Sequence, residues 1–435
     1  LNPNYLGCYG NHTVKSPVID RISQQSTIFT ECHTAINLTT PSHASMITGV
    51  LPSVHGVYEN ARPVSTDFKT VSELFSENGF DTMASVSSLQ LNPEYSNLGQ
   101  GFNLFITAGK PGISGEITVN RAIRWFSEAS NENLFAWIHL FDCHAPYNPP
   151  LIYRHMYIDE PAWFSYPKNQ PKRLKSIDKE HHASPALVDT RAFLKREPFN
   201  RWFSEWLGDT ADETYAVKLY LGAVSFTDRQ LELFFNALSQ KGIWDRSTVL
   251  ITSDHGESFG EHQIYYDHWG PYEQSIDVPL IIKKAYNADR SIDTTLASTL
   301  DVPPTLLAQC NIKIPDSYMG VSLVKKSEPS NKLKKRMIFT EHTRNVAVTV
   351  RDSQYKLIMP KTRQDFYPES IEMYDISRDL SEVDNIIDKN PEIADQLTEA
   401  LDGLMYEISH IQKPEVPCSP DNSVTDQLKS LGYLD

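Results

Sequence analysis

Apolar residues alternate between short runs and helically spaced stretches along most of the chain. The short runs have the length of buried strands and cover residues 27–35, 82–88, 134–140, 247–252 and 278–283. The helically spaced stretches cover residues 71–79, 116–130 and 213–241. Strands that alternate with helices predict an α/β fold, in which helices sandwich a large mixed, mostly parallel sheet. Ligands of such sheets bind outside the carboxyl ends of the strands.

The C-terminal part of the chain has a different pattern. Four short apolar runs predict antiparallel strands over residues 337–341, 346–351, 355–359 and 373–376. An amphipathic helix is predicted over residues 391–408, after a polar, basic linker over residues 325–335. We therefore predict an α/β domain over residues 1–330, with an irregular insertion over residues 150–212, and a smaller α+β subdomain over residues 336–435.

Composition excludes some classes of function. The 435 residues include 40 basic and 55 acidic side chains, which give a net charge of −15. An acidic excess argues against a nucleic-acid-binding protein, whereas small anionic substrates stay open because local fields decide their binding. The five cysteines are too scattered for a disulfide framework. No apolar run approaches the roughly 20 residues of a membrane helix.

The stretch from Leu38 to Gly49 combines hydroxyl groups with the signs of a helix. Pro41 suits a first helical turn, where its missing N–H would have no partner, and Gly49 suits the helix end. Thr39 or Thr40 is therefore expected at a helix N-terminus, where free N–H groups and the helix dipole favour an anion. A hydroxyl there is a candidate nucleophile, although on this stretch alone an N-cap threonine is the simpler interpretation.

A second stretch, Ser253-Asp254-His255-Gly256-Glu257, follows the apolar run over residues 247–252. An Asp-His pair at the end of a buried strand is typical of a metal site. Metal ligands, a hydroxyl and a helix N-terminus together indicate cleavage of an ester at phosphorus or sulfur.

Several motifs, in their order along the chain, resemble those of the sulfatase family within the alkaline phosphatase superfamily. Thr39-Thr40-Pro41-Ser42-His43-Ala44-Ser45, followed by Thr48-Gly49, resembles the family signature Cys/Ser-x-Pro-x-Arg-Ala-Ser followed by Thr-Gly. Thr39 lies at the nucleophile position and His43 at the arginine position. The resemblance extends nearly end to end. It implies the same α/β fold with a C-terminal α+β subdomain made of an antiparallel sheet and a helix.

Further motifs supply histidines. His144-Ala145-Pro146-Tyr147 resembles a family element whose histidine contacts the anionic group of the substrate, although its prolines can also simply end a strand. His268 lies where sulfatases usually carry a lysine that binds the sulfate oxygens, and an imidazole can donate a hydrogen bond there. His139 is assigned to the preceding strand and His55 to holding a loop. His262 stays open between supporting the site and lying at the surface.

The resemblance implies one divalent metal ion, held by Asp254 and His255 with Thr39 as a third ligand. A histidine ligand favours zinc or manganese over calcium or magnesium, which prefer oxygen ligands. The site would bind a small anionic ester, with no role for nucleic acid and no membrane segment in this chain.

The threonine decides which ester is expected. Sulfatases oxidise Cys or Ser to formylglycine, and threonine cannot give that aldehyde, so Thr39 is expected to act unmodified. His43, His144 and His268 would contact the substrate or protonate the leaving group. Relatives with a threonine nucleophile are phosphodiesterases, phosphonate hydrolases and phosphoethanolamine transferases. We therefore expect phosphate or phosphonate esters to be favoured over sulfate esters.

The segment from Leu1 to Gly10 resembles a family stretch that follows a hydrophobic strand ending in Asp-Asp or Asp-Thr. We expect that strand, about 10–15 residues long, to precede Leu1 and to supply a carboxylate metal ligand. The 435-residue chain alone is then expected to be inactive. The compartment, cytoplasmic or periplasmic, stays open because an export signal would also lie upstream.

Two alternatives stay open. A phosphoethanolamine-type transferase has similar loops around Asp254 and His144, and it would need membrane helices lost by truncation. A non-catalytic binding protein on the sulfatase fold is permitted by His43 in place of arginine. Four retained residues argue against it: Asp254, His255, His144 and His268. The oligomeric state also stays open.

Overall fold

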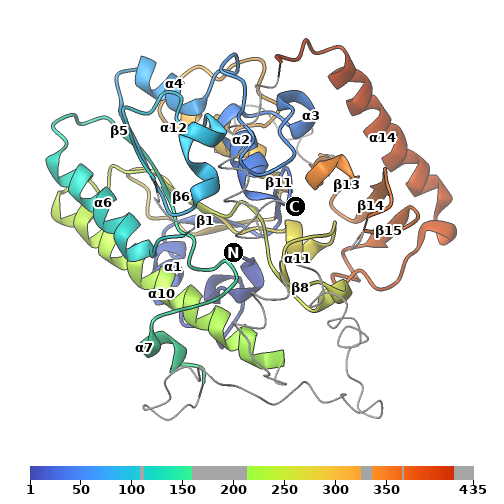
Figure 1. Cartoon of the computed structure of the whole chain (residues 1–435), viewed down its shortest axis with the longest axis horizontal. Helices are drawn as coiled ribbons and strands as arrows, with labels where there is room; N and C mark the ends of the chain where they lie inside the picture. Colours follow the sequence, from blue (N-terminus) through green and yellow to red (C-terminus); the bar gives the residue numbers. More distant parts are fainter. Residues whose placement is uncertain (108–111, 159–212, 325–335, 365–366, 416–435) are drawn as a thin grey trace.

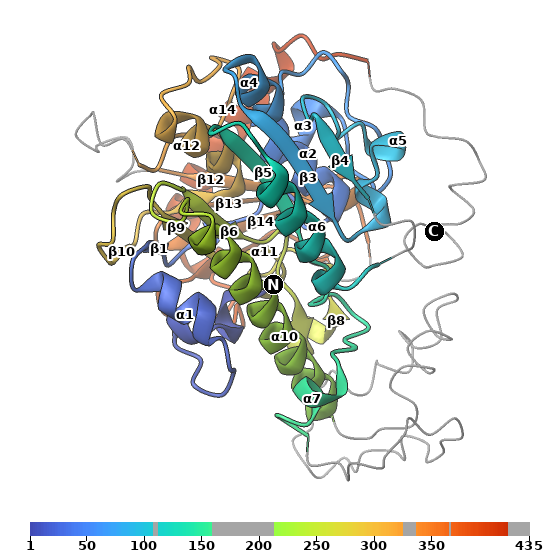
Figure 2. The same ribbon diagram turned by 90° about the vertical axis from the view of Figure 1, so that its left-hand side faces the viewer.

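The computed structural model describes residues 1–107, 112–158, 213–324, 336–364 and 367–415. Its larger part has three layers, in which strands lie between two groups of helices (Figures 1 and 2). The first group consists of α1 (Pro17–Ser23), α6 (Gly115–Glu128) and α10 (Glu213–Gln240). The second consists of α2 (Thr39–Thr48), α4 (Val71–Glu77) and α12 (Val302–Gln309).

The strand β5 (Leu134–His139) shows why its first five residues are apolar. Ala136 and Ile138 pack with the first group of helices, whereas Phe135 and Trp137 face the second group. Alternate side chains of a strand point to opposite faces, so a strand covered on both sides needs apolar residues at every position. The predicted α/β layering is confirmed.

The strands of the larger part form two main sheets. The parallel sheet has the order β4-β3-β5, with β3 at Asp81–Val86 and β4 at Leu104–Ile106. The mixed sheet has the order β10-β1-β9-β6. Its strands are β1 (Thr27–Phe29), β6 (Val249–Thr252), β9 (Leu280–Lys283) and β10 (Ser291–Asp293). Within the described residues, β5 and β6 are edge strands, and both are only half-buried.

Shorter elements connect these layers. Two further strand pairs are parallel β2 (Cys32–His33) with β11 (Ala297–Ser298), and antiparallel β7 (Ser258–Phe259) with β8 (Tyr265–Asp267). The short helices are α3 (Pro52–His55), α5 (Pro93–Ser96), α7 (Leu151–Arg154) and α11 (Glu273–Ile276).

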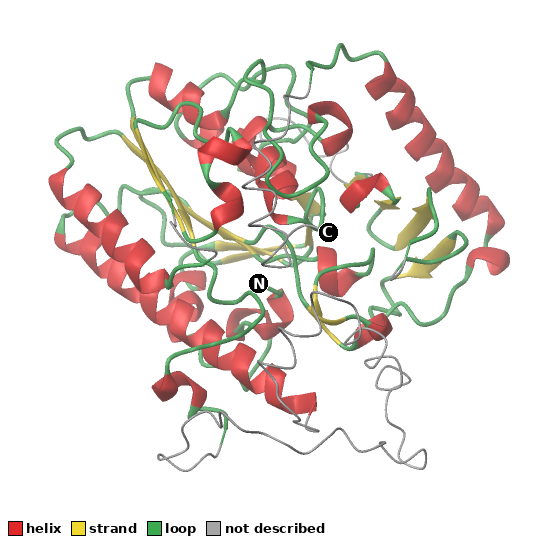
Figure 3. Ribbon diagram, in the orientation of Figure 1, coloured by secondary structure: helices red, strands yellow, loops and turns green. Residues whose placement is uncertain are grey.

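The C-terminal subdomain is an antiparallel sheet covered by one helix, as predicted, and Figure 3 shows it beside the larger part. The sheet has the order β12-β13-β14-β15, and α14 packs on its apolar face through Leu397 and Leu401. The elements are β12 (Ile338–Glu341), β13 (Ala347–Arg351), β14 (Tyr355–Pro360), β15 (Glu372–Asp375) and α14 (Pro391–Ser409). A bridge from Ile36 to Glu341 joins this sheet to the segment before α2.

One predicted strand is wrong as a single element. The run over residues 27–35 divides into β1 and β2, because β1 pairs with β9 and β10 while β2 pairs with β11. The predicted linker over 325–335 and most of the insertion over 150–212 lie outside the described residues, so the domain boundary stays a prediction. Within the described residues, no helix has the length and apolar character needed to cross a bilayer.

Candidate active site

Helix α2 places Thr39 at its first residue, as the sequence predicts. Leu38 has extended backbone angles and precedes the helix, and Gly49 ends it in the left-handed region at φ 70°. A side chain at Gly49 would also meet the ring of Tyr318 at 2.6 Å, so glycine is required on two counts. Thr39 is 2 % exposed. Its hydroxyl therefore lies buried at the positive end of the helix dipole.

The loop that follows β6 carries Asp254 and His255. Ser42 of α2 donates a hydrogen bond from Oγ to the Asp254 carbonyl oxygen (2.8 Å), which ties the loop to the helix of Thr39. The backbone N–H of Gly256 donates to the Ser275 carbonyl (2.9 Å). A Cβ on Gly256 would lie 2.0 Å from the Gln274 carbonyl oxygen, so only glycine permits this close approach.

These two elements bring the expected nucleophile and the expected metal ligands together. Thr39 Oγ1 lies 3.5 Å from His255 Nε2, and His255 Nε2 lies 3.4 Å from Asp254 Oδ2. On the other flank, His43 Nδ1 lies 3.8 Å from the same Asp254 oxygen. His43 is one turn after Thr39 on α2, and its Nδ1 donates a hydrogen bond to the Thr39 carbonyl (2.8 Å). Asp254 thus lies between His43 and His255.

The structure also places His144 and His268 at this site. The ring of His268 lies 3.7 Å from that of His255 and 5.8 Å from that of His144, measured between centroids. His144 comes from the loop after β5, and its Nδ1 donates to the Ala145 carbonyl (2.6 Å). All six residues expected in the site are therefore neighbours, and their catalytic roles stay predictions.

His139 is the residue that sequence reasoning missed. It was assigned to a strand and it does end β5, but its ring lies 5.1 Å from that of His43 and faces the site. His139, His43 and Asp254 offer ligand atoms that all lie within 4.8 Å of one another. The feature that could have indicated a place in the site is its position at the carboxyl end of a strand in a parallel sheet, where ligands bind.

Burial controls the charge state of the site. Desolvation lowers the pKa of His255 to about 4 and that of His139 to about 3, and it lowers the pKa of His43 as well. Burial also favours the neutral form of Asp254, but the rings of His255 and His43 outweigh it and hold the Asp254 pKa below its ordinary value. Near pH 7 the site thus presents one carboxylate among neutral imidazoles with available lone pairs.

Two of the other predicted histidines lie outside the site. His55 contacts the Ser45 hydroxyl through Nε2 (2.9 Å) and accepts the Val57 N–H at Nδ1, so it holds its loop as expected. His262 stacks on Tyr272 with ring centroids 3.5 Å apart, and its Nε2 donates to a backbone carbonyl in the C-terminal subdomain. His262 therefore fixes the loop between the two parts of the chain.

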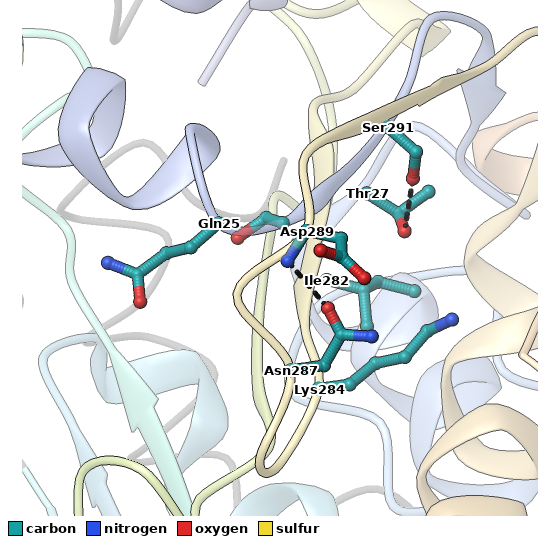
Figure 4. Close-up of a pocket in the computed structure, with 8 residues that line it drawn as sticks. Gln25, Thr27, Ile282, Lys284, Asn287, Asp289 and Ser291 are labelled. Atoms are coloured by element: carbon teal, nitrogen blue, oxygen red, sulfur yellow. Dashed lines mark hydrogen bonds between the residues drawn. The ribbon is translucent and has the colours of Figure 1, made fainter.

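A hollow elsewhere on the surface is separate from this site (Figure 4). It is lined by polar residues such as Gln25, Thr27 and Lys284 near the amino end of β1 and the carboxyl end of β9. β9 runs antiparallel to β6, with Lys283 opposite Val249, so the hollow and Asp254 lie at opposite ends of the mixed sheet. None of the expected site residues lines it.

Comparisons with known proteins identify the family to which the fold belongs. The family model described as "Sulfatase" matches residues 1–312, and the one described as "N-sulphoglucosamine sulphohydrolase, C-terminal" matches residues 260–407. Among curated proteins, the N-acetylglucosamine-6-O-sulfatase of Bacteroides thetaiotaomicron is 24% identical over 97% of this chain and 86% of its own length.

Solved structures show the same fold. One of them is a protein solved in complex with its substrate, D-glucosamine-2-N,6-O-disulfate. It superposes on this chain with a TM-score of 0.73 at 22% identity, covering 94% of this chain and 96% of the other. The phosphonate monoester hydrolase of Agrobacterium radiobacter superposes with a TM-score of 0.71 at 20% identity, covering 94% of both chains.

Proposed function

The chain belongs to the sulfatase family of hydrolases, and from this premise we propose that it cleaves phosphate or phosphonate esters with Thr39 as the nucleophile. The observation that carries the proposal is the position of the Thr39 hydroxyl. It lies at the start of α2 and 3.5 Å from His255 Nε2, beside the buried Asp254.

The residues around Thr39 suit a divalent cation. Asp254 is a carboxylate with its pKa held low, and His255 donates a hydrogen bond from Nδ1 to the Gly256 carbonyl (2.9 Å), so its lone pair is on Nε2. A histidine whose other nitrogen is fixed by a carbonyl is the usual form of a metal ligand. Asp254, His255 and Thr39 would hold zinc or manganese. When bound, such an ion offsets negative charge on the ester and lowers the pKa of a coordinated hydroxyl.

The proposed reaction has two displacements at phosphorus. Thr39 Oγ1 forms a bond to phosphorus while the bond to the alcohol oxygen breaks, and the hydroxyl proton of Thr39 is balanced by protonation of the leaving alcohol. Water then attacks the same phosphorus and releases Thr39 with its proton restored. We assign His144 and His268 to contacts with the ester oxygens or to proton delivery, which His144 can perform only when its Nε2 is protonated, because its Nδ1 donates to the Ala145 carbonyl. The amino end of α2 adds partial positive charge.

Threonine is the reason for preferring phosphorus over sulfur. A sulfated threonine has no hemiacetal through which sulfate can be expelled, whereas a phosphorylated threonine can be opened by attack at phosphorus. The fold alone does not distinguish sulfate esters from phosphorus esters as substrates, because the relatives include a protein named as a sulfatase and one named as a phosphonate monoester hydrolase.

The test measures turnover of four esters by the full-length protein loaded with zinc or manganese: p-nitrophenyl sulfate, p-nitrophenyl phosphate, bis(p-nitrophenyl) phosphate and a p-nitrophenyl phosphonate. We expect kcat/KM to be higher for the phosphorus esters. Thr39→Ala should lower kcat by about 10³-fold or more, because removal of a nucleophile eliminates the covalent route. Thr40→Ala is the matched control. Its hydroxyl donates to the Gln90 carbonyl on a neighbouring loop, so its loss should affect stability more than kcat.

Each other outcome has a meaning. Preferred turnover of the sulfate ester, or turnover that survives Thr39→Ala, contradicts the proposal. A metal-loaded protein that turns over none of the four esters contradicts the hydrolase and favours the transferase. A protein that neither binds metal nor turns over any ester favours the binding-protein alternative.

A further inference from the structure

We propose that His43, His139 and Asp254 form a second divalent-cation site, separate from the cation proposed at Asp254, His255 and Thr39. The second site shares Asp254 with the first, but it does not require Thr39 to be the nucleophile. It would hold zinc or a similar transition-metal ion, because two imidazoles and one carboxylate are the donors that such ions prefer.

The three side chains come from three separate elements and converge. His43 lies on α2, His139 ends β5, and Asp254 follows β6. Each offers one ligand atom, and these atoms all lie within 4.8 Å of one another. Ligand atoms that surround one zinc ion at about 2.0–2.2 Å lie roughly 3.3–3.6 Å apart in a tetrahedron, so small side-chain movements close this group on an ion.

The hydrogen bonds of the two histidines also point to a ligand. His43 Nδ1 bonds to the Thr39 carbonyl, which can only accept, so the proton is on Nδ1 and the lone pair is on Nε2. His139 Nδ1 is buried and has no hydrogen-bond partner. A buried polar atom without a partner destabilises the folded state, and an ion that bound this ring would remove that penalty.

The four residues do not form one compact ligand set. His255 Nε2 lies 3.4 Å from Asp254 Oδ2, yet His255 is not a member of the group whose ligand atoms lie within 4.8 Å of one another. Asp254 therefore belongs to two ligand sets, with His43 and His139 in one and His255 in the other. Such carboxylates commonly bridge two ions about 3.5–4 Å apart.

The experiment measures metal stoichiometry and does not depend on turnover. Metal-free protein is titrated with Co²⁺, whose visible absorbance reports nitrogen ligands, and bound zinc is measured by elemental analysis after dialysis. We expect about two equivalents for the wild type, with the second bound more weakly because the two cations repel each other. His139→Ala and His43→Gln should each retain about one equivalent. His262→Gln, on a histidine stacked away from the site, is the matched control and should retain both.

The variants separate this inference from the proposed function. Loss of one equivalent in His255→Ala, together with loss of the other in His139→Ala, supports two sites. A single equivalent in the wild type that survives His139→Ala and His43→Gln overturns the second site and leaves the first intact. A single equivalent lost in both His139→Ala and His255→Ala overturns the separation of the sites. Circular dichroism of each variant shows whether a loss of metal reflects unfolding.

Discussion

At the scale of single residues, the histidines around Asp254 determine which charges the site can bind. His43 lies at 3.8 Å and His255 at 3.4 Å from its carboxylate, and burial lowers the pKa of both rings. Neutral imidazoles cannot balance the charge of an anionic ester, whereas they can bind a cation that does so. The proposed metal ion would therefore add the positive charge that these neutral rings do not supply.

Motifs could predict Thr39, Asp254 and His255, because each belongs to a short stretch with a chemical reason of its own. His139 could not be selected in this way, because a histidine that ends an apolar strand is usually a packing residue. Its place in the site follows from the proximity of its ring to that of His43, which lies 96 residues earlier in the chain (139 − 43 = 96). That proximity depends on how the sheet and α2 pack.

Glu257 allows a prediction about pH and stability. It is buried, it accepts a hydrogen bond from the Tyr147 hydroxyl, and desolvation raises its pKa to about 8. The ordinary value in an unfolded chain is about 4.3, so between about pH 4.3 and pH 8 the folded state binds more protons than the unfolded state. Its contribution to stability is therefore complete below about pH 4.3 and is lost as the pH rises through 8.

Glu257→Gln should flatten this dependence, because glutamine keeps the acceptor oxygen and cannot ionise. Between pH 5 and pH 8 we expect the unfolding free energy of the wild type to fall relative to the variant by about 1 kcal/mol per pH unit. Urea denaturation at four pH values, with chelator present, measures this difference. Parallel curves for the two proteins would show that Glu257 is already ionised near pH 5.

At the scale of elements, Asp228 connects α10 to the start of α1. Its carboxylate accepts hydrogen bonds from the backbone N–H groups of Val18 and Ile19, at 3.0 and 2.8 Å, and it is 2 % exposed. The structure shows that it caps a helix 210 residues away along the chain. Amphipathic spacing predicts that α10 exists, but it does not reveal which polar residue on that helix binds another element.

Asp228→Ala should lower the unfolding free energy by about 1–3 kcal/mol, because two buried N–H groups lose their acceptor. Asp228→Asn is the control, since its amide oxygen can still accept one of these bonds and should preserve part of the stability. Both are measured by the midpoint of urea unfolding. Metal content should be unchanged, because Asp228 lies on a helix that does not contribute to the site. Equal stability of the alanine variant and the wild type would contradict a capping role.

For the molecule as a whole, periodicity was enough to predict the α/β class and the C-terminal subdomain. Helical and strand spacing are local properties, so they can be recognised without knowledge of pairing. The division of residues 27–35 between two sheets depends on partners distant in sequence, because β1 pairs with β9 and β2 pairs with β11. The same limit applies to the buried ionic network that joins the two parts of the molecule.

That network is centred on Glu273, at the start of α11. Its carboxylate contacts Arg351 of β13 at 2.8 Å and Lys356 of β14 at 3.0 Å, and Lys356 also contacts Glu382 at 2.7 Å. Lys356 and Glu382 have fully buried side chains. α11 follows His268 by five residues, so the C-terminal sheet holds the segment that brings His268 to the site.

Lys356→Met should therefore lower the unfolding free energy by about 3–5 kcal/mol, because it leaves the buried Glu382 carboxylate without its cation and removes one of the two cations that contact Glu273. Lys389→Met is the matched control. Lys389 pairs with Asp384 at the surface, with both side chains more than 60 % exposed, and its loss should change stability by about 0.5 kcal/mol or less. Urea denaturation measures both variants, and a comparison of KM at temperatures where Lys356→Met stays folded tests the link to His268.

If the two variants were equally stable, the network would be incidental to the joining of the subdomains. A large loss of stability with KM unchanged would show that the joint stabilises the fold without positioning His268.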